Sequence, residues 1–271
     1  MNIDNKRNII KRQVNVTARH TAILVMITLI GTGHVFNLRD ALLEQLEQIT
    51  PQVVCVELDQ QRYQGLMMKQ ANPEQYENSR KQLPLVYRLL ARFQDSMASE
   101  YGVIPGEEML TAIHYAQQYQ LPVEFIDMNA QHLFTQMMKQ MPLTERFKLF
   151  LSGFAGFFVS KKKVEQELEK FHENFTNYLD EVGKRYPTIK YMLIDKRNEH
   201  MVNQLTRLYD QYETIVACVG DGHIPGMTEL LSGQSIPNKA IRLKELQQFT
   251  PKEVKGESGF FSTQYSPPPE E

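Results

Sequence analysis

Residues 21–58 read TAILVMITLIGTGHVFNLRDALLEQLEQITPQVVCVEL and decide the fold class. The apolar run 21–30 predicts a buried strand, and the run 53–58 predicts a second one. Residues 37–50 between them have the pattern of an amphipathic helix, with four apolar positions on one face: Leu38, Leu42, Leu46 and Ile49. A strand, a helix and a strand in this order predict parallel strands joined by a helical crossover.

The same alternation continues along the chain, with further strands predicted at 123–126 and 214–219. We therefore predict an α/β fold with a small, mainly parallel sheet and β–α crossovers, in a single domain over residues 1–250. Residues 130–212 are helical in pattern almost throughout, and they predict a long insertion that caps the carboxyl end of the sheet. Residues 251–271 are rich in proline and polar residues at their end, and we predict that they form a disordered tail.

Composition excludes several classes of function. The chain has 271 residues, with 30 Lys and Arg against 32 Asp and Glu, so its net charge of −2 gives no general reason to bind nucleic acid. The longest apolar run is about half of the roughly 20 residues that a transmembrane helix needs. Two cysteines, Cys55 and Cys218, both within apolar runs, favour a reducing compartment, and we expect a cytoplasmic protein. The apolar stretch 150–158 before three lysines leaves peripheral contact with a membrane open, and the sequence also leaves homo-oligomer formation open.

Two matching turns carry the chemistry. Gly31-Thr32-Gly33-His34 and Gly220-Asp221-Gly222-His223 each follow an apolar run and precede a helical pattern. Such turns place His34 and His223 at the carboxyl edge of the sheet, where neutral imidazole can bind a divalent metal or act as a general base. The alternative for each turn is an ordinary loop in which the histidine only packs. Dinucleotide binding is disfavoured, because Phe36 and Pro225 stand where the third glycine of that motif is needed.

Three charged residues complete the candidate site. Glu57 ends a strand that is apolar throughout, so its burial would be costly without a cation or a partner such as Arg62. Glu108 is the inward carboxylate of its helix, next to the apolar stripe. Arg197 lies on the apolar face of its helix, where an arginine pairs with a buried carboxylate or binds an anionic group.

These residues occur in blocks that resemble the TraB/Tiki family. The blocks follow the family's order between about residues 13 and 232: LIGTGHV at 29–35, PQVVCVELD at 51–59 with Arg62-Tyr63, PGEEM at 105–109, FID at 125–127, Arg197-Asn198 with Met201, and VGDGHIPGM at 219–227. The resemblance implies the fold shared with erythromycin-esterase-like and ChaN-like haem-binding proteins. It also implies the metal-dependent peptidase activity proposed for the Tiki branch, with five site positions: His34, Glu57, Glu108, Arg197 and His223.

The leading hypothesis is therefore a metal-dependent hydrolase that acts on peptides. We expect His34, Glu57 and His223 to hold Mn²⁺, Co²⁺ or Zn²⁺, Glu108 to act as general base, and Arg197 to stabilise the oxyanion. One alternative is a non-catalytic protein that sequesters a peptide pheromone or haem. Another is a metal-free, esterase-like hydrolase that uses a histidine as general base.

Overall fold

A parallel sheet forms the centre of the protein. The computed structural model of the chain describes residues 26–33, 38–81, 106–156, 181 and 183–248. The described strands make one five-stranded sheet in the order β3-β2-β4-β1-β5, and every pair of neighbours is parallel. Their bounds are β1 (Met26–Thr32), β2 (Val53–Val56), β3 (Val123–Phe125), β4 (Thr214–Gly220) and β5 (Asn238–Ile241). The predicted α/β class with parallel strands is confirmed.

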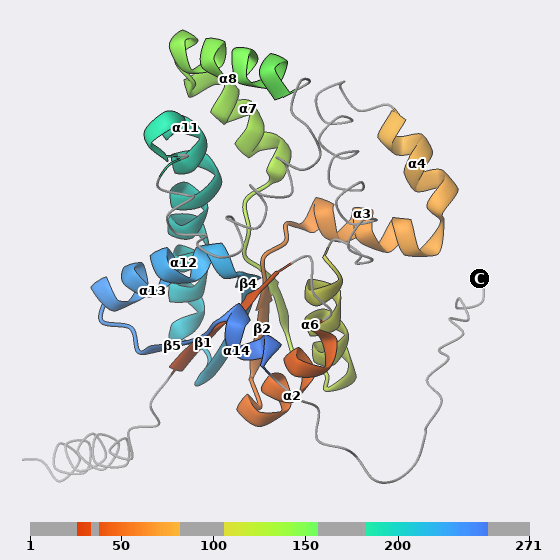
Figure 1. The fold of residues 1–271 in the computed structure, drawn as a ribbon. Helices are drawn as coiled ribbons and strands as arrows, with labels where there is room; N and C mark the ends of the chain where they lie inside the picture. The colour runs from red at the N-terminus through yellow and green to blue at the C-terminus, as the bar shows by residue number, and fades with distance from the viewer. Residues whose placement is uncertain (1–25, 34–37, 82–105, 157–180, 182, 249–271) are drawn as a thin grey trace, which may run out of the picture.

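Helices cover both faces of this sheet (Figure 1). One face packs against α2 (Arg39–Ile49), α6 (Glu107–Gln118) and α14 (Leu243–Gln247). The opposite face packs against α12 (Lys196–Tyr209) and α13 (Ile224–Gly233). Between β2 and α6, the described residues also form α3 (Gln60–Ala71) and α4 (Pro73–Lys81).

The apolar strands are explained by burial on both faces. In β4, Ile215, Ala217 and Val219 belong to the core under α12 and α13. Val216 and Cys218, which alternate with them, belong to the core under α2 and α6. All five side chains are fully buried, as a parallel sheet between two helical layers requires. Cys55 and Cys218 are likewise buried free thiols within these cores.

The carboxyl edge of the sheet contains a topological switch point between β1 and β4. After β1 the chain continues into α2 on one face, whereas after β4 it continues into α13 on the other. The two strands are neighbours whose ends are aligned, with Thr32 beside Gly220. Connections that leave in opposite directions open a crevice at the carboxyl ends of such strands, where parallel sheets place their binding sites. The two Gly-x-Gly-His turns begin at this point.

The helical segment 130–212 has two parts. From the end of β3 the chain enters α7 (Ala130–Gln140) and α8 (Leu143–Gly156), and later α11 (Pro187–Lys190) and a π-helix, η1 (Tyr191–Asp195). A small methionine-rich core joins α7 to η1 through three buried residues, Met137, Met141 and Met192. α12 instead covers the sheet itself, so the predicted insertion also supplies a crossover helix.

Several sequence-based predictions fall partly or wholly outside the described residues. These include His34, residues 157–180 of the insertion and the predicted tail 251–271. Among the helices that the structure describes, none combines the length and the apolar character needed to cross a membrane.

Candidate functional site

Glu57 lies at the centre of the candidate site, directly after β2. Its backbone N–H donates to the carbonyl of Cys218 at 3.0 Å, which continues the pairing of β2 with β4 by one residue. Its carboxylate then turns along the carboxyl edge, where Oε2 accepts a 2.6 Å hydrogen bond from the N–H of Gly220. Glycine at position 220 gives the carboxylate room, because a Cβ there would lie only 3.3 Å from Oε2 of Glu57. Backbone geometry therefore fixes one oxygen of Glu57.

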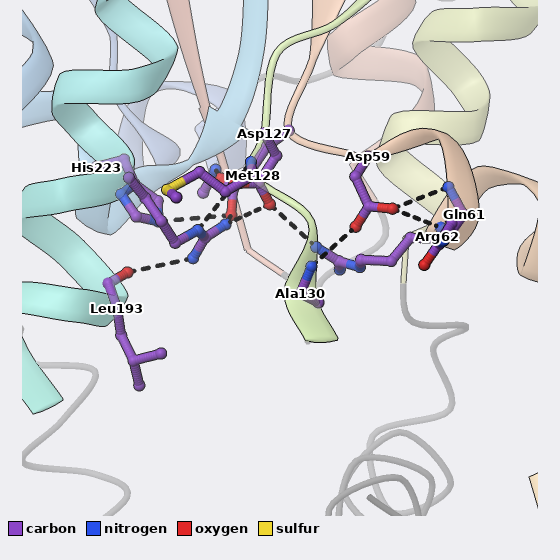
Figure 2. A network of polar contacts seen from close by, with 11 residues as sticks. Asp59, Gln61, Arg62, Asp127, Met128, Ala130, Leu193 and His223 are labelled. Carbon is purple, nitrogen blue, oxygen red and sulfur yellow. Dashed lines mark hydrogen bonds and ion pairs between the residues drawn. The ribbon is translucent and has the colours of Figure 1, made fainter. Parts of the chain in front are cut away.

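Arg197 binds the other oxygen of Glu57 and joins it to a second acid. Its Nη2 donates to Oε1 of Glu57, and its Nε and Nη2 hold both oxygens of Asp127 at 2.9 Å. Nη1 donates to the carbonyl of Leu193 in the π-helix just before α12, at 3.3 Å. Figure 2 shows Asp127 between this cluster and Arg62, whose Nη1 donates to Asp127 at 3.3 Å. Asp127 is thus shared by two arginines.

His223 faces Glu57 from the short 3-10 turn η2 (Asp221–His223) that follows β4. Its Nε2 lies 3.4 Å from Oε1 of Glu57. Its Nδ1 donates to the side-chain oxygen of Asn198 at 2.7 Å. His223 and Asn198 are 5% and 3% exposed, so the ring is held inside the protein between a carboxylate and an amide.

Burial and nearby charges act in opposite directions on Glu57. Burial alone would raise the pKa of Glu57, but His223, Arg197 and the N–H of Gly220 outweigh it and hold this pKa well below its usual range. Burial would likewise lower the pKa of Arg197, whereas Glu57 and Asp127 raise it above its ordinary value. Both groups are therefore ionised, and the buried cluster has two carboxylates around one guanidinium.

A second ion pair fixes the turn that carries His223. Arg242 donates from Nε and Nη2 to the two oxygens of Asp221 at 2.8 and 2.7 Å, and the N–H of Leu243 donates to the same carboxylate at 2.8 Å. Burial opposes ionisation of Asp221, yet these bonds lower its pKa. The carboxylate also lies against Gly31, where a Cβ would overlap Oδ1 of Asp221. Asp221 thus fills the space between the ends of β1 and β4.

Comparisons with known proteins identify the family of this chain. The profile of the TraB/PrgY/gumN family matches residues 16–233, which is most of the chain. The chain belongs to the TraB/PrgY/gumN family. It is also 31% identical over 219 residues to an uncharacterised protein of Methanocaldococcus jannaschii, an alignment that covers 76% of this chain and 53% of that relative. The chain thus spans about half the length of the curated relative that it matches.

Within this TraB-family fold, three predicted site residues come together: Glu57, Arg197 and His223. Glu108 lies in the first turn of α6, on the opposite side of the sheet from Arg197, and is 5% exposed. Helix α6 packs against β4, and burial together with the nearby carboxylate of Glu108 raises the pKa of Cys218 to about 12. His34 lies outside the described residues, so its pairing with His223 stays a prediction.

The structure corrects two details of the prediction. Arg62 binds Asp127, and the cation on Glu57 is Arg197. The glycines were expected to begin sharp turns, but Gly31 and Gly220 are still within β1 and β4. Gly31 requires the absence of a Cβ, because Asp221 occupies that space, whereas a Cβ at Gly220 would make a tight contact with Glu57.

The sequence analysis included Asn198 and Asp127 in the blocks of the resemblance but gave neither residue a role in the site. Asn198 follows Ile194 by four residues and precedes Met201 by three, so it lies on the same apolar face as Arg197. A polar residue at such a position was a usable signal. Asp127 follows the end of β3 by two residues, at the same edge as Glu57, and it also belongs to the FID block of the resemblance.

The contact between Gly31 and Asp221 gives a direct stability prediction. Gly31→Ala should destabilise the protein by about 1–3 kcal/mol, because Arg242 and Leu243 hold the carboxylate that the new methyl group would displace. Urea unfolding measures this loss. Gly233→Ala is the matched control, since a Cβ there meets nothing within 4 Å, and it should leave stability unchanged or raise it by up to about 1 kcal/mol. Equal effects of the two substitutions would contradict the proposed contact.

Proposed function

We propose that this TraB-family protein is a metal-dependent hydrolase of peptides, with His223, Glu57 and His34 at its centre. The observation that carries the proposal is the pairing of His223 with Glu57 at the switch point between β1 and β4. His34 follows Thr32 by two residues, and Thr32 is aligned with Gly220 in the neighbouring strand. The two Gly-x-Gly-His motifs therefore begin in adjacent, aligned strands, which supports a shared centre.

The described donors fit a divalent cation. Nε2 of His223 and Oε1 of Glu57 converge at 3.4 Å, and the hydrogen bond from Nδ1 to Asn198 is the kind of outer contact that metal-binding histidines make. The carboxylates of Glu57 and Asp127 are balanced by Arg197 and Arg62, so the fit to a cation rests on the donor atoms of His223 and Glu57. Among the described residues, no group of three Asp, Glu, His or Cys side chains is arranged to hold a metal. The proposal therefore assigns the third position to His34.

A bound divalent ion would act there as a Lewis acid on a peptide carbonyl. The chain's own residues have the supporting roles. Gly220 and Arg197 fix the two oxygens of Glu57, and Asn198 fixes the ring of His223. Glu108 stays the general base that the sequence proposes, and it lies on α6, on the face of the sheet opposite α12.

The structure changes the role that we propose for Arg197. An oxyanion ligand needs free N–H groups, but Arg197 already uses four of its five donors on Glu57, Asp127 and Leu193. We therefore propose that Arg197 positions Glu57 and compensates its charge instead of binding substrate. This arrangement keeps Glu57 ionised and oriented before any ligand arrives.

Product analysis by mass spectrometry tests the proposed function. Purified protein is incubated with a mixture of peptides in the presence of Mn²⁺, Co²⁺ or Zn²⁺, then with a chelator, and then with the metal restored. We expect cleavage products that the chelator abolishes and the metal restores. Cleavage that persists in excess chelator would instead support a metal-free histidine base, and stoichiometric capture of peptide or haem without products would support a binding protein. Either result would overturn the metal-dependent reaction.

A further inference from the structure

Asn198 is buried against the imidazole of His223. It lies in the first turn of α12, directly after Arg197, and is 3% exposed. Its Oδ1 accepts a 2.7 Å hydrogen bond from Nδ1 of His223. A carbonyl oxygen can only accept, so Nδ1 has to carry a proton in this arrangement.

The amide of Asn198 is also fixed from its other side. Its Nδ2 lies against Gly226 in the first turn of α13, where a Cβ would overlap that nitrogen. Gly226 therefore provides the space in which the amide fits. With Nδ2 packed against α13 and Oδ1 on His223, the side chain is held at the contact between α12 and α13.

This contact determines which nitrogen of His223 faces the centre of the site. Neutral histidine in water carries its proton mainly on Nε2, and a fixed acceptor at Nδ1 reverses that preference. When the ring is neutral, Nε2, which lies 3.4 Å from Glu57, is then the nitrogen with the free lone pair; in the protonated ring it carries an N–H that faces this carboxylate. Only this tautomer can bind a cation or accept a proton on the side of Glu57.

We infer that Asn198 is a positioning residue that selects the Nδ1–H tautomer of His223 and so makes Nε2 available to the ligand of the site. The inference deepens the proposed function and rests on it for the identity of that ligand. The tautomer itself is a property of the protein without metal. It can be measured whether or not the chain hydrolyses peptides.

Two substitutions separate this role from simple packing between α12 and α13. Asn198→Leu keeps the branching at Cγ but removes the acceptor. Asn198→Asp keeps an acceptor for Nδ1 and should preserve the tautomer. Asn203→Leu is the matched control, because Asn203 is exposed on the same helix. If Asn198 only packed between α12 and α13, the Leu and Asp variants would differ in stability, but the proton of His223 would stay on the same nitrogen.

Long-range ¹H–¹⁵N NMR of the full chain reads the tautomer, at a pH where the ring is neutral and without metal. The signals of His223 are assigned by their loss in His223→Gln. We expect Nδ1–H in the wild type, in Asn198→Asp and in Asn203→Leu, and Nε2–H in Asn198→Leu. If Asn198→Leu does not fold, Gly226→Ala takes its place, since the added Cβ displaces the amide from His223. Retention of Nδ1–H in whichever of these two variants folds would overturn the inference.

Metal titration then connects the tautomer to the ligand. We expect Asn198→Leu to weaken binding of Mn²⁺, Co²⁺ or Zn²⁺ by about 10–100-fold, and Asn198→Asp to change it much less. If the NMR experiment shows the predicted tautomer shift while neither the wild type nor any variant binds metal, the proposed function is overturned and the inference stays intact. If Asn198→Leu instead keeps the wild-type metal affinity and the wild-type tautomer, the inference is overturned and the proposed function is not.

Discussion

His223→Ala should lower peptide hydrolysis by at least about 10²-fold while the protein keeps its fold. The ring makes only two described polar contacts, with Glu57 at the carboxyl edge of the sheet and with Asn198 in the first turn of α12. The apolar cores on the two faces do not include His223. Initial rates with a cleaved peptide measure the loss, and circular dichroism checks the fold.

The same assay tests the predicted partnership with His34. If both imidazoles serve one centre, His34→Ala should cause a loss similar to that of His223→Ala, and the double substitution should be no worse than either one. His114→Ala is the matched control, because His114 is exposed on α6. Losses that multiply in the double variant would show that the two histidines act independently.

Arg197→Met should destabilise the protein by about 3–5 kcal/mol, which is the largest stability effect that we expect. The methionine fills a similar volume but leaves Glu57 and Asp127 without their buried cation. Their side chains are 10% and 3% exposed, so water cannot replace the guanidinium without opening the site. Urea unfolding followed by circular dichroism measures the change.

Arg62→Met is the control that the structure provides for Arg197. Both arginines bind Asp127, but the side chain of Arg62 is 41% exposed whereas that of Arg197 is 15% exposed. An exposed pair of this kind contributes about 1 kcal/mol or less, since water and salt screen it. Similar losses in the two variants would mean that burial does not determine the strength of the cluster.

The fold was predictable because the strands are apolar throughout. The run Thr214–Val219 could be assigned from sequence, since a strand covered on both faces has no alternation of polar and apolar residues. β1 extends past Ile30 to Thr32, because Gly31 and Thr32 continue the pairing with β4. Glycine is typical of turns, so the sequence pattern ended the strand two residues early.

The sequence predicted a site residue wherever a local pattern placed it at the carboxyl edge of the sheet or on the apolar face of a helix. Glu57 followed a buried strand and Arg197 lay on an apolar helix face, and the structure brings the two into contact. The partners across the sheet were not predictable in the same way. Arg242 is far from Asp221 in sequence, and their ion pair depends on β5 lying beside β1. Such pairings require the strand order, which a single sequence does not encode in any local pattern.

Metal binding by the purified chain tests the central claim most directly. Calorimetric titration with Mn²⁺, Co²⁺ and Zn²⁺ is carried out on the wild type, His34→Ala and His223→Ala. We predict that the wild type binds a single ion, and that both substitutions weaken binding by more than the roughly 100-fold that loss of an outer partner causes. A wild type that binds none of the three ions, or His34→Ala with wild-type affinity, would contradict a centre shared by His34, Glu57 and His223.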